Sequence, residues 1–293
     1  LVMKIRPLTS KFGMEILDLT LPEVTESTNF PEVRRLFEQH SVLLFRNQKV
    51  NDLQHLKFGQ LFGPIEDRLV DEREPGDTYK IPKVSNVRED GSIIDELDEH
   101  TLHLKANFQW HADSTFMPSP ALTNILIARL VTSSGGETEL ASTRVSWSVM
   151  PKKLKESIRG RGIWHRYAHS RAKVDPNLAK LSMFHKWKDQ HWKSVWTNPV
   201  NGQEALYIAS HAYKVDGYSS AQSELLISEL IEFCTQPHFV YSHRWEVGDV
   251  LLWDQRAVLH RGRPWPYREP RTLSSICVSA AETDGLEQMR LSA

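Results

Sequence analysis

Two stretches of the sequence, far apart along the chain, contain residue types that can bind a transition metal. The first is Trp-His-Ala-Asp at 110–113, which separates a histidine from a carboxylate by one residue. In a β-strand the side chains at i and i+2 leave the same face, so His111 and Asp113 could offer a nitrogen and an oxygen to one ion. Downstream, His260 could complete a triad of two histidines and one carboxylate. Such a triad leaves positions on the metal open for a co-substrate and dioxygen.

The overall composition favours an enzyme that acts on a small molecule. The 293 residues include 36 Lys and Arg against 37 Asp and Glu, so neither nucleic acid nor an anionic membrane is an implied partner. Cys234 and Cys277 are too few for a disulfide framework, and no CxxC motif indicates structural zinc. No apolar stretch has the length of a membrane span, and the first residues lack a signal-peptide core. We therefore expect a cytoplasmic protein.

The elements that must position these residues can be predicted from periodicity and turn residues. The helical spacing of apolar residues, with Asn51 as a cap and Gly63-Pro64 as a stop, predicts three helices. Alternating or continuous apolar runs predict strands, two of which are joined by a turn at 246–249 as a meander. The predicted helices cover 32–40, 51–62 and 220–235, and the predicted strands cover 41–46, 238–245 and 250–253.

Helices at the front, one late helix and short strands elsewhere predict a mainly β fold with flanking helices, either a β-sandwich or a jelly roll. No repeat or linker divides residues 1–293, which predicts a single domain. Residues 66–99 are rich in Asp, Glu, Pro and Gly, and we interpret them as long loops broken by a short strand near 81–87. Long loops in a compact domain are often functional, so we expect an active-site lid within 66–104.

Several motifs, in the same order, resemble the taurine dioxygenase and 2,4-dichlorophenoxyacetate dioxygenase family of iron(II)- and 2-oxoglutarate-dependent oxygenases. They are Trp-His-Ala-Asp-Ser-Thr-Phe at 110–116, Gly-Gly-Glu-Thr at 135–138 and Trp-Asp-Gln-Arg at 253–256, followed by His260 and Arg271. The stretch 239–249 is similar to the phenoxyacetate branch. The resemblance implies a double-stranded β-helix (jelly roll, cupin-like) core, with iron(II) bound by His111, Asp113 and His260.

The resemblance also implies a site for 2-oxoglutarate. Thr138 and Arg271 match the family's ligands for its distal carboxylate, and the arginine fork suits a carboxylate in a way that lysine does not. Asn107 matches a position near the cofactor and substrate. Residues expected near the substrate are Thr115, Tyr167, Tyr207, His211 and Ser275, although the two tyrosines could equally belong to the core.

Two departures from the family pattern concern the substrate and the metal. The family often places a second arginine a few residues after the cofactor arginine, where it binds the substrate anion, but this chain has Ser274 and Ser275. Either the substrate is less anionic, or a cation elsewhere binds it, for which Arg88, Lys105 and Arg166 are candidates. Gln255 stands where the family usually has asparagine, and we expect this change to affect local packing.

The expected reaction is oxidation of a C–H bond of a small organic substrate by hydroxylation, bond cleavage or desaturation, with 2-oxoglutarate and dioxygen giving succinate and carbon dioxide. A cupin-like hydrolase or isomerase using zinc or manganese at the same triad is the first alternative, and a non-catalytic binding protein is the second. A helical pair of His165 and His169 is a further, weaker candidate metal site. His100 and His103, like His185 and His191, are interpreted as loop or surface residues. Jelly rolls of this kind often associate through their helices, which favours a homo-oligomer.

Overall fold

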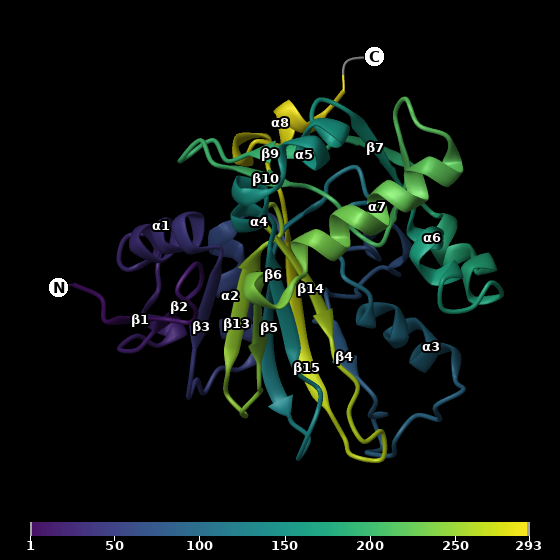
Figure 1. Ribbon diagram of the computed structural model, residues 1–293. Helices are drawn as coiled ribbons and strands as arrows, with labels where there is room; N and C mark the ends of the chain where they lie inside the picture. The colour runs from purple at the N-terminus through teal and green to yellow at the C-terminus, as the bar shows by residue number, and fades with distance from the viewer. Residues whose placement is uncertain (1, 292–293) are drawn as a thin grey trace.

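The computed structural model describes residues 2–291, and its largest sheet has seven strands in the order β1-β2-β3-β13-β5-β15-β4 (Figure 1). The neighbouring strands run antiparallel, except β2 and β3, which are parallel. From β3 to β4 in this order, neighbours in space are distant in sequence, as in a jelly roll. The strands are β1 (Ile5–Pro7), β2 (Met14–Ile16), β3 (Val42–Phe45), β4 (Lys83–Ser85), β5 (Ala121–Leu130), β13 (Val250–Asp254) and β15 (Thr272–Ser279).

A second sheet packs against the large one and completes the sandwich. It consists of β6 (Thr138–Ser142), β12 (Val240–His243) and β14 (Val258–Gly262) in the order β12-β6-β14, and Figure 1 shows β6 and β14 lying over β5 and β15. Leu140 and Val258 of this sheet share a buried cluster with Leu126 and Leu251 of the large sheet. Strands buried on both faces form continuous apolar runs, as β3 and the first four residues of β13 do. The predicted fold class is confirmed.

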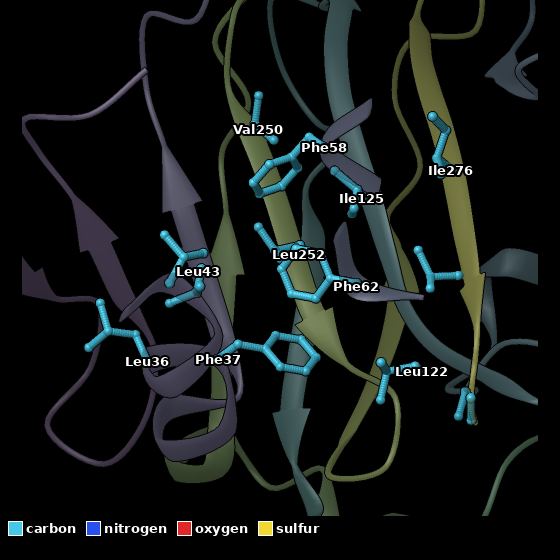
Figure 2. Close-up of a cluster of buried hydrophobic side chains, with 14 of the residues drawn as sticks. Leu36, Phe37, Leu43, Phe58, Phe62, Leu122, Ile125, Val250, Leu252 and Ile276 are labelled. Carbon is cyan, nitrogen blue, oxygen red and sulfur yellow. The ribbon is translucent and has the colours of Figure 1, made fainter. Parts of the chain in front are cut away.

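The other face of the large sheet is covered by two helices, α1 (Phe30–His40) and α2 (Asp52–Phe62). Figure 2 shows Phe37 of α1 and Phe58 and Phe62 of α2 against the sheet, where the ring of Phe62 lies edge-on, 5.3 Å and 5.4 Å from the other two. Full burial of each such side chain contributes about 1.5–3 kcal/mol. This core fixes the sheet on which the candidate site is built.

The remaining elements surround the open end of the sandwich. Two small sheets have the orders β11-β7-β8 and β10-β9, and α7 packs its buried residues Leu226, Ile227 and Leu230 in a cluster with Trp147. The strands are β7 (Gly162–His165), β8 (Gln190–Lys193), β9 (Val195–Thr197), β10 (Glu204–Leu206) and β11 (Ala212–Val215). The helices are α3 (Glu99–Lys105), α4 (Thr143–Val149), α5 (Lys152–Ile158), α6 (Tyr167–Ala172), α7 (Ser220–Cys234) and α8 (Leu286–Met289).

The three predicted helices are confirmed within two residues at each end. α1 begins two residues before its predicted start, because Pro31 is tolerated in the first turn of a helix, where its missing N–H is not needed. Asn51 caps α2 as predicted, with its side chain accepting a hydrogen bond from the backbone N–H of Gln54 at 2.8 Å. The strand predicted near 81–87 is β4, and α3 is an additional helix inside the segment predicted as a lid.

The predicted meander over 238–253 is wrong. β12 pairs with β6 in the small sheet, whereas β13 pairs with β3 and β5 in the large sheet. The residues between them cross from one layer to the other, and Trp245 is buried at this crossing. The local pattern of two apolar runs and a turn is the same for a hairpin and for a crossing, since strand pairing depends on distant partners.

Candidate metal and cofactor centre

His111, Asp113 and His260 converge at one end of the sandwich. Their ligand atoms all lie within 4.8 Å of one another, and Oδ1 of Asp113 is 3.5 Å from Nε2 of His111 and 3.6 Å from Nε2 of His260. The two histidines form an isolated antiparallel bridge, in which each backbone N–H donates to the carbonyl of the other, at 3.0 Å and 2.8 Å. Side chains of directly opposed residues lie on the same face, so this bridge holds the two imidazoles together.

The expectation that His111 and Asp113 share a strand is wrong. His111 belongs only to the bridge with β14, and Asp113 begins a turn. Ser114 then adopts a left-handed backbone, with a φ of 61°, which sharpens that turn. The carboxylate is still directed at the two imidazoles, because the turn starts at Asp113 itself.

Hydrogen bonds orient two members of the triad, His111 and Asp113. Nδ1 of His111 donates to the carbonyl of Gln109 at 2.7 Å, which leaves the lone pair of Nε2 for the metal. Oδ2 of Asp113 accepts from Nδ2 of Asn124 at 3.0 Å and from Nε2 of Gln255 at 2.6 Å, which leaves Oδ1 for the metal. Gln255 therefore orients this candidate ligand, so the expectation that it affects only packing understates its contacts.

The charges on these groups suit a divalent metal. Desolvation opposes ionisation of Asp113, but His260, His111 and Asn124 outweigh it and hold the pKa of the carboxyl below its usual value. Burial lowers the pKa of His260 to about 3. At neutral pH the site therefore presents an ionised carboxylate with a neutral imidazole at His260, the states that metal ligation requires. Two imidazole nitrogens and one carboxylate oxygen fit iron(II) in a facial triad.

A cavity of about 780 Å³ opens above the triad, and Arg271 forms part of its wall. The side chain is buried, and no carboxylate in residues 2–291 lies within ion-pairing distance of it. Its Nη2 donates to the carbonyl of Gly136 at 2.8 Å, and its guanidinium stacks 4.8 Å from the ring centre of Trp265. A Cβ at Gly136 would lie 3.0 Å from Nε of Arg271, so glycine leaves room for the guanidinium. A buried cation without a counter-ion fits a bound carboxylate.

Thr138 and Asn107 line the same cavity. Oγ1 of Thr138 accepts a hydrogen bond from Nε1 of Trp245 at 2.9 Å, so its own O–H remains free to donate to an anion. Asn107 lies in the 3-10 turn Ala106–Phe108, which follows α3. The three residues predicted for 2-oxoglutarate are thus brought to one cavity with the metal triad.

The structure separates the five residues predicted for the substrate into two groups. Tyr167, His211 and Ser275 line the cavity. Thr115 and Tyr207 do not: Oγ1 of Thr115 bonds Nδ1 of His165 at 2.9 Å, and the ring of Tyr207 packs edge-on against Trp196. Expecting these two at the substrate is therefore wrong, because both belong to the core behind the cavity wall.

Ser275 takes part in the network behind the metal. Its Oγ donates to Oδ1 of Asn124 at 2.9 Å, and Asn124 in turn donates to Asp113. Ser274 lies on the opposite side of β15, where its Oγ accepts from Nε of Arg129 at 3.3 Å. Ser275, one of the two serines in the region where the family pattern often has a second arginine, therefore supports the candidate ligand Asp113.

The cations proposed from sequence as alternatives are placed elsewhere. Arg166 pairs with Asp189 at 2.7 Å on the surface, and Arg88 lies beside a separate surface depression. Neither these two nor Lys105 lines the cavity above the triad. Arg68 and Arg171 do, together with His103 of α3. Sequence reasoning missed these three, and the assignment of His103 to a loop or surface position is wrong.

The candidate metal pair His165 and His169 is also wrong. His165 ends β7 and is buried against Thr115, whereas His169 lies in α6, beyond the strand end. The two imidazoles are therefore not on successive turns of one helix, which an i, i+4 metal site requires.

Comparison with known proteins matches residues 4–277 to the family described as Taurine catabolism dioxygenase TauD, TfdA family. The chain belongs to this family. It is 33% identical over 270 residues to the alpha-ketoglutarate-dependent 2,4-dichlorophenoxyacetate dioxygenase of Cupriavidus pinatubonensis, covering 91% of this chain and 94% of that one. It is 29% identical over 277 residues to the (S)-phenoxypropionate/alpha-ketoglutarate-dioxygenase of Sphingobium herbicidovorans, covering 92% of each.

A solved structure of AAD-2 in complex with Mn(II) and N-oxalylglycine aligns with a TM-score of 0.88 at 30% identity, covering 97% of this chain and 99% of that one. As a member of the TauD/TfdA family, the chain is a 2-oxoglutarate-dependent non-haem iron dioxygenase, and the phenoxyacetate branch expected from the motifs is confirmed. It uses iron(II), 2-oxoglutarate and dioxygen to oxidise a C–H bond of a small organic substrate. The hydrolase or isomerase alternative is not favoured. None of the described helices has the length and apolar character needed to cross a bilayer.

Proposed function

We propose that His111, Asp113 and His260 bind the iron(II), and that Thr138 and Arg271 bind the distal carboxylate of 2-oxoglutarate with Asn107 beside it. The observation that carries the proposal is that a buried, unpaired arginine and a ready-made facial triad line one cavity. When bound, iron(II) supplies the activation of dioxygen that is coupled to oxidative decarboxylation of 2-oxoglutarate.

The residues of the chain contribute orientation and a dry environment. Gln255 and Asn124 fix the carboxylate of Asp113, and the carbonyl of Gln109 fixes the tautomer of His111. Such outer contacts tune ligand geometry and basicity. Aromatic side chains on the cavity wall exclude water from the reacting carbon, namely Tyr79, Phe108, Phe116, Tyr167, Trp187 and Trp265.

The substrate is a small aromatic compound whose oxidised carbon is bonded to an ether oxygen. The aromatic wall supports an aromatic substrate, and the named activities of the two relatives concern phenoxy compounds. Hydroxylation of a carbon next to an ether oxygen gives a hemiacetal, which breaks its C–O bond and releases a phenol. Tyr167 and His211 contact this substrate.

Residues 66–104 act as the lid of this cavity. Many of them line it, and the side chain of Lys186 holds the segment by donating to the carbonyl of Arg68 at 2.6 Å and to Glu72 at 3.3 Å. Closure of the segment would exclude water from the site. Hydrogen exchange tests this role: N-oxalylglycine with Mn(II) should slow exchange within 66–104, and unchanged exchange there would argue against it.

For the molecule as a whole, we infer one dioxygenase domain over residues 1–293 that assembles as a homo-oligomer in the cytoplasm. Two free cysteines, one buried and one partly buried, suit a reducing compartment. Exposed Val149 of α4 and Leu225 of α7 offer apolar contacts for a second copy. Light scattering should give a mass of at least two chains. Calorimetry should show a single unfolding transition, and cell fractionation should recover the protein in the cytoplasmic fraction.

Succinate formation tests the proposed reaction. Purified protein with iron(II), 2-oxoglutarate and oxygen should form succinate in step with substrate loss when offered a panel of neutral compounds, amino acids, phenoxy acids and sulfonates. We expect the phenoxy acids to couple best, with release of a phenol. Coupling to amino acids alone would contradict the proposed substrate class, and substrate loss without oxygen would contradict the reaction.

A further inference from the structure

Arg171 is a second buried cation in the cavity, on the α6 side. Its side chain is 7% exposed, and it lines the same cavity as the metal triad. Within residues 2–291 no carboxylate forms an ion pair with it, whereas the neighbouring cation Arg68 is paired with Glu66 at 3.1 Å. Burial lowers the pKa of Arg171, which shows that the protein leaves its charge poorly solvated.

The contacts of Arg171 fix its guanidinium and leave donors free. Nη1 donates to Oγ of Ser170 at 2.8 Å, while Nε and Nη2 are each 3.3 Å from Nδ1 of His103. The guanidinium lies over the rings of Tyr167 and Phe184, at 4.5 Å and 5.5 Å from their centres. Three of the five N–H groups of the side chain are thus used, and the other two have no partner in the described part of the chain.

His103 adds a further donor beside Arg171. Because Nδ1 accepts from the guanidinium, the neutral ring carries its proton on Nε2. Nε2 makes no hydrogen bond with the described residues, and His103 lines the cavity. The ring is neutral at neutral pH because burial, and after it the positive charge of Arg171, lower the pKa of His103 to about 3. A cationic fork and a neutral N–H donor therefore lie together on one wall.

Ser170 links Arg171 by hydrogen bonds to His211, which lies beside the metal triad. Its O–H donates to the carbonyl of Tyr167 at 3.0 Å, so its oxygen accepts both from Arg171 and from Nδ1 of His211 at 3.0 Å. The ring of His211 is in turn 6.2 Å from that of His111. A ligand held by Arg171 would therefore lie close to the iron triad, on the α6 side of the cavity rather than on β15.

The cavity-lining charges that are not exposed to solvent leave one positive charge over in the loaded site. Iron(II), the Asp113 carboxylate, the 2-oxoglutarate dianion and Arg271 sum to zero. Arg68 cancels Glu66, and Arg73 cancels Asp67. Arg171 then remains as an uncompensated buried cation, which is unfavourable unless an anion pairs with it. The excess matches a substrate with a single negative charge, and neither a neutral molecule nor a dianion would balance it.

We propose that Arg171, with His103 beside it, is the specificity-determining residue that binds the carboxylate of a monoanionic substrate. This rests on the proposed function, because it requires the substrate to occupy the cavity above the triad. It also decides between the two alternatives left by Ser274 and Ser275: the anion-binding cation has moved across the cavity from β15 to α6. The substrate keeps its negative charge, although the second arginine of β15 is absent.

Binding to protein loaded with Mn(II) and N-oxalylglycine tests the proposal without turnover. Calorimetry would measure the affinities of phenoxyacetate, phenylacetate, benzoate and hexanoate, each against its neutral primary amide. At least one carboxylate should bind wild type more tightly than its amide. Arg171→Gln should weaken that carboxylate roughly 10- to 100-fold, the range for a charge-assisted hydrogen bond, and leave the amide unchanged. Arg171→Lys should fall between the two, because it keeps the charge and loses the fork.

Two controls separate this proposal from the proposed function and from misfolding. Arg166→Gln removes a surface arginine of the same segment and should bind the carboxylate as wild type does. N-oxalylglycine affinity reports whether the metal and cofactor site is intact in every variant. If N-oxalylglycine fails to bind wild type, the proposed function fails. Two results would overturn the assignment of Arg171 while N-oxalylglycine still binds. The first is that wild type prefers no carboxylate over its amide, a comparison that needs only wild-type protein. The second is that Arg171→Gln retains the preference for the carboxylate.

Discussion

Gln255 holds Asp113, a proposed metal ligand, through both its carboxylate and its backbone. Its Nε2 donates to Oδ2 of Asp113 at 2.6 Å, and its Oε1 accepts from the backbone N–H of the same residue at 3.1 Å. The side chain comes from the segment between β13 and β14, which leads into the strand that carries His260. The second sequence cluster thus positions Asp113 of the first. A family position usually occupied by asparagine thus has a defined role here with the longer amide.

Replacing Gln255 should weaken metal binding. Gln255→Leu removes both contacts, and loss of such an outer partner typically lowers metal affinity about 10- to 100-fold. Gln255→Asn keeps an amide that is one methylene shorter and should lose less. Isothermal titration with Mn(II) measures the change, and Gln203→Leu, an exposed change in a distant turn, is the matched control. Equal affinities for wild type and Gln255→Leu would show that Asn124 alone orients Asp113.

Replacing Arg271 should affect 2-oxoglutarate rather than the metal. Arg271→Gln removes the cation proposed to bind the distal carboxylate, so the Kd of N-oxalylglycine should rise roughly 10- to 100-fold while Mn(II) affinity stays within about 3-fold. Arg263→Gln, a more exposed arginine beyond β14, should change neither. Parallel loss of metal and N-oxalylglycine binding in Arg271→Gln would indicate a disrupted fold instead.

The buried charge network around Arg256 should be a major source of stability. Arg256 is buried and bonds both Asp254 and Glu38. Arg256→Leu removes the cation that Asp254 and Glu38 share and leaves them only Arg144 and Arg34, so it should cost about 3–5 kcal/mol of unfolding free energy. The surface pair Arg35 and Glu32 offers a control, since Arg35→Leu should cost no more than about 1 kcal/mol. Urea denaturation of both variants compares them, and similar losses would mean that the buried network is not special.

Acid should destabilise the protein through its buried histidines. Burial lowers the pKa of His55, on α2, to about 4 from an ordinary 6.5. Between these values the unfolded chain binds a proton that the folded chain does not, so stability present above pH 6.5 is lost as the pH falls towards 4, by about 3 kcal/mol for this residue. His55→Gln should make the unfolding free energy less dependent on pH in this window, as measured by urea denaturation.

The control for His55 is Lys57→Ala, an exposed change on the same helix. It should keep the wild-type pH dependence. Buried His165, whose pKa is lowered to about 3, should contribute in the same direction, so the slope is reduced but not abolished in His55→Gln. An unchanged slope in His55→Gln would contradict the assignment of the acid sensitivity to this group.

Local signals in the sequence predicted the elements and ligands that depend on near neighbours. α1, α2 and α7 have 11, 11 and 15 residues, enough for periodicity and caps to define them. The residues proposed as metal ligands lie in recognisable sequence motifs. By contrast, α3 and α6 have 7 and 6 residues, too few for an amphipathic pattern, and they supply His103 and Arg171. The cavity wall they form depends on tertiary packing.

The same reasoning explains the errors. The runs that became β12 and β13 have the pattern of a hairpin, but the residues with which they pair in β6, β3 and β5 lie at least 99 positions away in the chain. Thr115 lies in the motif at 110–116 and Tyr207 lies four residues before His211, so both are close to the site in sequence. One residue of rotation along a strand or turn nevertheless moves a side chain from cavity to core. A sequence motif identifies which segment reaches the site. It does not determine which side chains of that segment point into the cavity.

The most direct test of the proposed centre is anaerobic absorption spectroscopy with iron(II) and 2-oxoglutarate. Wild type should develop the weak visible charge-transfer band of 2-oxoglutarate chelated to iron(II), and His111→Ala should lose it. His191→Ala is the control, because His191 bonds Asp216 outside the cavity, and it should keep the band. A band of wild-type intensity in His111→Ala would contradict the assignment of His111, Asp113 and His260 as the iron ligands.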